Sequence, residues 1–354
     1  MRARVGHCLL VPLLCVLCVV VASAQQDNAP AQADDGKIYL DVVVTGKSGP
    51  AVGGLQQQDF TLLDNKVSQP ILSFQAVRGR EAPLEIVLVV DDVNTGLEII
   101  AYERTQIDKF LRTDGGRLAH PMALAFLTDS GIQVQNDFSS DGNALSAEMD
   151  QHALGLHSIR RSGGIYSAVE RFQLSLDALQ QLASREAGRP GRKILVWISP
   201  GWPLFSGAGA EEQLDSKQEQ TIFNNVVRLS TLLRQGRITM YSIDPLGTAD
   251  AGGGRAFFWQ AFVKGISKPA QAQWGNLALQ VLSTQSGGLA LTGSNDITAS
   301  IERCLADTQA YYEMSLAPAV DTKPDEYHQL EVHVADHKLT ARTRQGYYAQ
   351  SAVR

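Results

Sequence analysis

The pattern of hydrophobic and polar positions changes twice along this chain. In residues 37–80, short runs that alternate between apolar and polar positions, such as Ile38–Val44, are separated by turns such as Gly46–Pro50. In residues 81–317, continuous apolar runs alternate with longer segments whose apolar residues recur every three or four positions. Residues 318–354 return to short alternating runs. Alternation is typical of strands and the longer spacing of helices, so we expect two β regions around an α/β region.

The middle region predicts a parallel sheet. Its apolar runs are typical of strands buried on both faces, and they are Ile86–Val90, Met122–Leu127, Lys193–Ile198 and Ile238–Ile243. The helix-like segments are Glu98–Leu111, Tyr166–Leu182, Glu219–Leu233, Asn276–Ser286 and Ile297–Asp307, with a further strand at Gly287–Leu291. Such alternation builds βαβ units. The predicted fold class is therefore α/β, with a doubly wound, mostly parallel sheet flanked by helices.

The two ends of the mature chain are predicted to form one small β module. Near the N-terminus, Phe60–Leu63, a turn at Asp64–Lys66 and Ile71–Phe74 indicate strand, turn and strand. The strand-like runs near the C-terminus are Tyr311–Leu316, Tyr327–Val334 and Leu339–Thr343. We expect this C-terminal β tail to pack on the N-terminal segment.

The N-terminus has the features of a secretion signal. Basic residues precede an apolar stretch, Cys8–Val21, and Ala22–Ala24 fits the small-residue rule for cleavage. We expect residues 1–24 to be a signal peptide and residues 25–36 to be a flexible leader. The mature protein is then secreted across the cytoplasmic membrane, to the periplasm or outside the cell, and has no membrane span. An uncleaved N-terminal anchor stays open as the alternative.

The net charge limits the classes of partner, and the cysteine content limits how the mature chain can be stabilised. The formal net charge of -6 argues against nucleic acid and anionic membranes, which attract basic surfaces. Of the 4 cysteines, all except Cys304 would leave with the signal peptide. The mature chain therefore has no disulfide framework and must rely on a large core. Cys304 lies in a helical pattern and is expected to be part of that core.

The candidate site lies where the first run of the middle region, Ile86–Val90, ends in two carboxylates. Ligand sites in parallel sheets lie just past the carboxyl ends of the strands. Asp91, Asp92, Asn94 and Thr95 would project there, and their oxygen atoms suit a hard cation such as Mg²⁺. The alternative is that Asp91 and Asp92 cap the following helix, where carboxylates complete free N–H groups.

Other motifs are incomplete. Val42–Ser48 resembles the end of a phosphate-binding loop, but Asp41 replaces the required glycine. Ile86–Asp92 resembles the first strand of a receiver domain, but the lysine that a receiver needs at the end of a later strand is missing. Neither a nucleophile elbow nor a zinc motif occurs. We therefore expect no catalytic residues and no enzymatic activity.

Several segments in order along the chain resemble a von Willebrand factor type A (vWA) domain, and most of all the vWA-related family of exported proteins described from Acidobacteria. The matching segments are Gly54–Asn65, Val89–Thr95, Ala123–Asp129, Gly163–Ala168, Ile194–Gly201, Tyr241–Asp244, Ser286–Gly288, Asn295–Asp296, Tyr311–Pro318 and Arg342–Tyr347. The resemblance implies a vWA-like sheet and, in members that bind ligand through a metal, a metal-ion-dependent adhesion site.

This sequence departs from the metal-binding pattern of that family. Asp91 and Thr95 match the first and last positions of Asp-x-Ser-x-Ser, but Val93 replaces the middle serine. Ile165 stands where the family has a threonine, and Pro200 where it has an aspartate. The resemblance therefore implies a degenerate adhesion site. We expect no cofactor, with Mg²⁺ as the open alternative.

The function that the sequence favours is a protein-binding module of adhesion or scaffold type, whose partner is another extracytoplasmic or envelope protein. The expected contact surface is the carboxyl edge of the sheet, formed by Asp91–Thr95, Thr128–Gly131, Gly163–Tyr166 and Ser199–Phe205. The residues expected to contact the partner are Thr128, Asp129, Gly163, Gly164, Ser199, Trp202 and Phe205. The apolar loop after Ser199 could instead fold onto the core. Two other functions stay open, a metal-dependent enzyme that uses Asp91 and Asp92 with Asp129 or Asp244, and a purely structural envelope protein.

Overall fold

The computed structural model describes residues 36–152, 164–203, 214–247, 258–320 and 323–350. The predicted signal peptide, the leader up to residue 35, Gly163 and Phe205 lie outside the described residues. No helix in the described ranges is long and apolar enough to cross a membrane.

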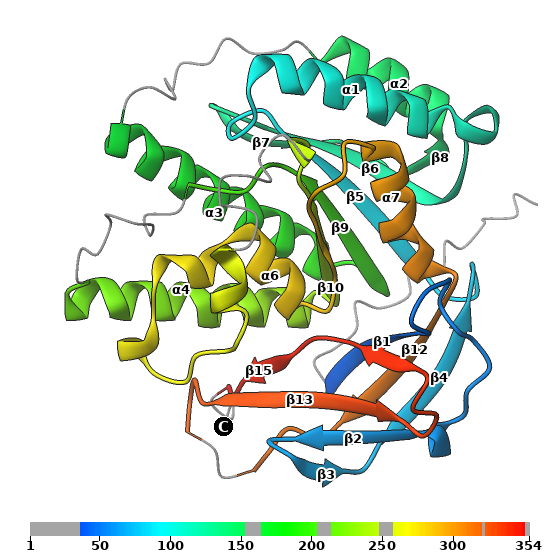
Figure 1. Ribbon diagram of the computed structural model, residues 1–354, viewed down its shortest axis with the longest axis vertical. Helices are drawn as coiled ribbons and strands as arrows, with labels where there is room; N and C mark the ends of the chain where they lie inside the picture. Colours follow the sequence, from blue (N-terminus) through cyan, green and yellow to red (C-terminus); the bar gives the residue numbers. More distant parts are fainter. Residues whose placement is uncertain (1–35, 153–163, 204–213, 248–257, 321–322, 351–354) are drawn as a thin grey trace, which may run out of the picture. The chain divides into compact units, whose positions relative to one another are not determined.

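The centre of the fold is a seven-stranded sheet with the order β11-β10-β9-β5-β6-β7, in which β8 also pairs with β6 (Figure 1). Its strands are β5 (Leu84–Asp91), β6 (Arg117–Thr128), β7 (Gly131–Val134), β8 (Ser139–Asp141), β9 (Arg192–Ile198), β10 (Ile238–Ile243) and β11 (Ala290–Leu291). All pairs from β11 to β6 are parallel, whereas β7 and β8 are antiparallel to β6. The predicted mixed α/β fold with a mostly parallel sheet is confirmed.

Helices cover both faces of this sheet (Figure 1). The helices on one face are α1 (Leu97–Leu111), α2 (Gly142–Gln151) and α7 (Ile297–Leu305), and those on the other are α3 (Gly164–Ala187), α4 (Ser216–Gln235) and α6 (Leu279–Gln285). Successive residues of β5 divide between the faces: Ile86 and Leu88 pack with α1, and Val87 and Val89 with α3. This burial on both sides explains the unbroken apolar runs.

Some elements differ from the sequence prediction. The predicted helix at 276–286 divides into a short 3₁₀ turn and α6, because Ala278 between them has an extended backbone with φ -63° and ψ 142°. The predicted strand at 287–291 is reduced to β11. Helix α2 was not predicted. The 3₁₀ turns are η1 (Gln57–Asp59), η2 (Thr113–Gly116), η4 (Trp259–Phe262), η5 (Pro269–Gln271), η6 (Trp274–Leu277) and η7 (Ala306–Thr308).

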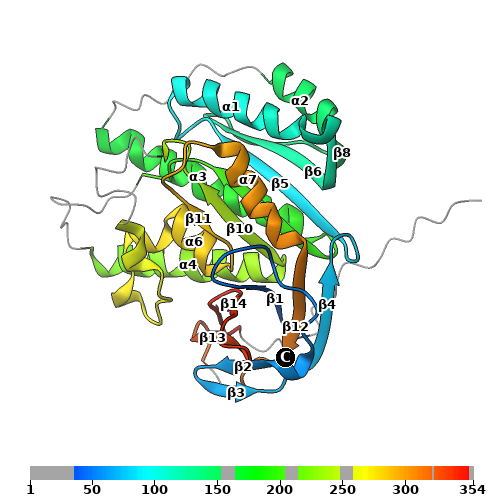
Figure 2. The same cartoon turned by 45° about the vertical axis from the view of Figure 1, so that its right-hand side comes forward.

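Strands from both ends of the described chain build two four-stranded sheets, β14-β1-β12-β4 and β15-β13-β2-β3 (Figure 2). Their bounds are β1 (Ile38–Thr45), β2 (Phe60–Asp64), β3 (Val67–Gln69), β4 (Ser73–Arg78), β12 (Ala310–Leu316), β13 (Tyr327–Val334), β14 (Thr340–Arg342) and β15 (Gly346–Tyr348). The two sheets share one apolar cluster, to which Leu40, Leu62 and Val332 belong. The hairpin partner of β2 is β3, whereas the predicted strand at 71–74 begins later and belongs to the other sheet as β4.

An ion cluster joins the central sheet to the sheet that contains β1. Arg237, between α4 and β10, places its Nη2 atom 2.6 Å from Asp41 Oδ1 and 2.8 Å from Glu313 Oε1. Asp41 on β1 and Glu313 on β12 are opposite each other in the strand register. The guanidinium therefore places a positive charge between two carboxylates that would otherwise repel each other in a nearly buried place.

We predict that Arg237→Ala lowers the free energy of unfolding by about 3 kcal/mol, because it leaves both carboxylates without their cation. The measurement is urea unfolding followed by circular dichroism. Arg228→Ala is the matched control, since Arg228 is exposed on α4 and its guanidinium donates to Asn225, and it should change stability by less than about 0.5 kcal/mol. Equal effects of the two substitutions would contradict the role assigned to the cluster.

Candidate functional site

The carboxylate of Asp91, at the end of β5, is held by internal hydrogen bonds. The backbone N–H of Asn94 donates to Oδ1 at 2.9 Å, and its side-chain Nδ2 donates to Oδ2 at 3.0 Å and to Oδ1 at 3.2 Å. From β9, the indole Nε1 of Trp197 donates to Oδ2 at 3.1 Å. Burial raises the pKa of Asp91 above its usual 3.8, and these hydrogen bonds oppose the rise. The residue is fully buried.

Asn94 connects the loop after β5 to α3, which lies on the other face of the sheet from α1. The Nδ2 atom of Asn94 also donates to the hydroxyl of Ser175 on α3, at 2.9 Å. Helix α1 begins after Gly96, which makes no side-chain capping bond. The alternative that Asp91 and Asp92 cap this helix is therefore wrong, because Asp91 instead bonds within its own turn.

Asp92 and Glu103 are the acids of this region whose carboxylates lack hydrogen bonds. Both side chains are buried, and none of their four carboxylate oxygens has a hydrogen-bond partner. Burial raises the pKa of Asp92 to about 6, although the nearby charge of Arg104 opposes the rise. Burial and the charges of Asp92 and Asp91 raise the pKa of Glu103 well above 4.5. Both groups therefore keep their proton to a higher pH in the folded state than in the unfolded state.

Glu103 was not identified from the sequence, although a signal was present. It lies three residues after Ile100 and four before Ile107, and both isoleucines are buried. A glutamate at that spacing lies on the apolar stripe of the helix. A carboxylate on such a stripe must be paired or neutral when the helix packs on a sheet.

The arrangement around Asp91 does not fit a hard cation. A carboxylate offers about four acceptor positions, and the donors from Asn94 and Trp197 already occupy the oxygens of Asp91. Thr95 is fully buried, and its hydroxyl has no partner. In the ranges that the structure describes, no three His, Cys, Asp or Glu side chains are placed to hold a metal ion. Asp129 and Asp244 therefore do not complete a metal centre with Asp91.

The residues predicted to contact a partner occupy different environments. Thr128, the last residue of β6, is half-buried, and its hydroxyl donates to the Gly131 carbonyl oxygen at 3.2 Å. Asp129 follows in the turn to β7. Ser199 is buried after β9 and accepts the N–H of Gly201 at 3.2 Å. Gly164 is exposed at the start of α3.

Trp202 folds back onto the core, as the alternative from the sequence allowed. It is buried, and its ring lies 5.4 Å from that of Trp197 in an edge-to-face arrangement. Because Trp197 also bonds Asp91, Trp202 packs behind the carboxylate that fixes the loop. Trp202 therefore packs in the core against Trp197, the residue that donates to Asp91.

Three exposed apolar side chains at this edge belong to α3, and Leu97 at the start of α1 is a further one. Ile165 is 59% exposed, Tyr166 86% and Val169 49%. We name these three residues the α3 patch. Ile165 and Val169 are four positions apart, so they share one face of the helix. Ile165 and Tyr166 belong to the contact segment predicted from the sequence, Gly163–Tyr166, whereas Val169 does not. The structure shows that the buried stripe begins with Ser167 and Phe172.

Comparison with known proteins gives no match to a family model and none to a curated protein. Among solved structures, proximal thread matrix protein 1 from the mussel byssus is 10% identical over 66% of this chain and 49% of that chain, with a TM-score of 0.36. The SpRpn10 VWA domain is 12% identical over 64% of this chain and 97% of that chain, with a TM-score of 0.31. Manganese-loaded Plasmodium vivax TRAP protein is 9% identical over 78% of this chain and 98% of that chain, with a TM-score of 0.31. This chain thus spans about half the length of the byssus protein, and TM-scores this low transfer no activity or ligand.

We predict that Asp92 makes the protein less stable as the pH rises. Between its unfolded pKa of 3.8 and its folded pKa of about 6, the folded state holds more protons than the unfolded state. Stability therefore falls from about pH 4 to about pH 6 and then levels off. Asp92→Asn should raise the free energy of unfolding at pH 7 by about 2 kcal/mol and flatten this slope.

The measurement is urea unfolding across this pH range. Asp137→Asn is the matched control, because Asp137 is exposed on the loop after β7, and it should leave the slope unchanged. An Asp92→Asn protein that keeps the wild-type slope would contradict the assignment.

Proposed function

We propose that this chain is a vWA-like, non-enzymatic protein-binding module of adhesion or scaffold type, and that the α3 patch at the carboxyl edge of its central sheet contacts the partner. The sheet order and the helices on both faces support the vWA-like part of this proposal. The strands from the two ends of the chain form the supporting β module. The partner that fits the expected signal peptide is another extracytoplasmic or envelope protein.

The observation that carries this proposal is the exposure of the α3 patch. An isoleucine, a tyrosine and a valine gather in the first two turns of one helix, each at least 49% exposed. Exposed apolar residues scattered singly need no explanation, but a group at the edge where α/β folds bind their ligands does. Tyrosine is also enriched among the side chains that contribute most to binding energy in interfaces.

The proposal includes a degenerate adhesion site that does not use a cation at Asp91. We predict that titration of Mn²⁺ or Mg²⁺ into the mature protein gives no heat of binding, because Asn94 and Trp197 already occupy the Asp91 oxygens. The melting temperature should also stay unchanged at millimolar metal. Binding that Asp91→Ala abolishes would contradict this part of the proposal and favour recognition through a metal.

We predict that the double variant Ile165→Ser/Tyr166→Ser weakens partner binding at least tenfold, since truncating a central contact residue costs about 2 kcal/mol or more. The partner would be captured by crosslinking in the native envelope, identified, purified and titrated against both proteins. Val320→Ser is the matched control, because Val320 is 85% exposed and lies between β12 and β13. Equal affinity of the Ile165/Tyr166 variant and the wild type would contradict the role of the patch.

A further inference from the structure

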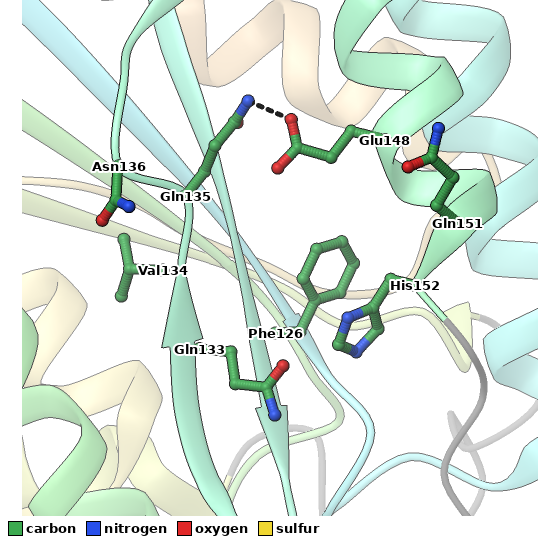
Figure 3. Close-up of a pocket in the computed structure, with 8 residues that line it drawn as sticks. All are labelled: Phe126, Gln133, Val134, Gln135, Asn136, Glu148, Gln151 and His152. Atoms are coloured by element: carbon green, nitrogen blue, oxygen red, sulfur yellow. Dashed lines mark hydrogen bonds between the residues drawn. The ribbon is translucent and has the colours of Figure 1, made fainter.

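A polar groove lies between the edge strand β7 and the C-terminal turn of α2 (Figure 3). Its volume is about 360 Å³, which is at the small end of the range for small-molecule sites. The side chains that line it and point into it are Phe126, Gln133, Gln135, Glu148, Gln151 and His152. It shares no residue with the α3 patch, so an inference about it stands independently of the proposed function.

One wall of the groove is a stacked ring pair. The rings of Phe126 and His152 lie 3.8 Å apart with an angle of 11° between their planes. His152 caps the C-terminus of α2, and Arg104 Nη2 donates to its carbonyl oxygen at 2.9 Å. The Arg104 guanidinium also lies 5.8 Å from the centre of the Phe126 ring. The ring pair is therefore held in place before any ligand binds.

Carboxamides make up most of the polar lining. Gln135 is fixed, since its Oε1 atom accepts the Leu124 N–H at 3.1 Å and its Nε2 atom donates to Glu148. Among the residues drawn in Figure 3, the amides of Gln133 and Gln151 make no hydrogen bond to the others. Each of these two amides offers a donor and an acceptor side by side. That pairing matches neighbouring hydroxyl groups, which also donate and accept.

The charges around the groove disfavour anionic ligands. Glu148 is the charged residue in the lining, and Gln135 already donates to it. Burial and the nearby charge of Arg104 lower the pKa of His152, so its ring is neutral at pH 7. Arg104 itself is turned to the His152 carbonyl. An anion would meet a carboxylate without a facing cation, so a neutral ligand fits better than an anion.

An added peptide strand is the main competing occupant, because β7 is the edge of the sheet. This edge is poorly suited to it. Strand β7 has 4 residues, and beyond it Arg185 on α3 donates to the carbonyl oxygens of Gln135 and Asn136, at 2.8 Å and 3.3 Å. A short edge whose continuation is occupied by an arginine offers few backbone groups to a partner strand.

The geometry points to a binding site for a neutral saccharide of one or two sugar units, with hydroxyl pairs on the amides of Gln133 and Gln151 and a sugar face against the Phe126–His152 pair. The ligand class follows from the free carboxamides, the ring wall and the missing cation. The groove is open and shallow, so the expected affinity is weak, on the order of 1 mM.

The test is saturation-transfer NMR on the mature protein, with maltose, cellobiose, lactose and N,N′-diacetylchitobiose as probes. We expect transfer from at least one of these neutral disaccharides. The double variant Gln133→Ala/Gln151→Ala should weaken its binding about tenfold, because it removes two hydrogen-bonding amides. Both residues are exposed, so the variant should keep its fold, and circular dichroism checks this. Gln220→Ala, an exposed glutamine on α4, is the matched control and should bind like the wild type.

Three results would overturn the inference. The first is no transfer from any of the four disaccharides, and the second is transfer that the Gln133/Gln151 variant leaves unchanged. The third is binding of glucuronate or of an extended valine- and threonine-rich peptide in place of the neutral sugars. A glucuronate signal would show that the groove selects charge, and a peptide signal would assign it to strand addition at β7.

Discussion

The hydrogen bonds that Asp91 accepts determine the arrangement of the carboxyl edge. One carboxylate receives donors from its own turn and from Trp197 on β9, while Asn94 continues the network to Ser175 on α3. These contacts join two strands and a helix at the point where a parallel sheet usually opens to its ligand. An ionised or strongly polarised group in a dry interior is stable only when its acceptors are satisfied. The main role of the Asp91 carboxylate is therefore to stabilise the fold.

The neighbouring acids have no such network. Asn94 and Trp197 donate to Asp91, whereas Asp92 and Glu103 are buried without a hydrogen-bond partner. Their pKa values are raised by burial, and the negative charge on Asp91 adds to the effect. One carboxylate that is fully hydrogen-bonded, beside two that have no partner and raised pKa values, differs from a cation site, where several carboxylates share one positive charge.

The sheet was predictable from the sequence because strands buried on both faces leave little ambiguity, and Ile86–Val90 is such a run. Helix α2 was missed because its large buried side chains at helical spacing are only Leu145 and Met149, although Asp141 accepts capping hydrogen bonds at its start. Asp91 lies at the end of β5, as the pattern predicted, but its hydrogen-bond donors were missed. Trp197 sits in an apolar run, and nothing local shows that its indole N–H meets a carboxylate on the neighbouring strand.

Arg104 connects the acidic region with the groove at β7. Its positive charge favours the ionised form of Asp92, and its Nη2 atom holds the His152 carbonyl oxygen behind the ring pair. It also stabilises the neutral form of His152. One side chain on α1 thus acts on a buried acid and on a surface groove, so substitutions at Asp92 alter the electrostatic surroundings of the arginine that orders the groove. This coupling follows from burying acids beside a cation that has a second, structural role.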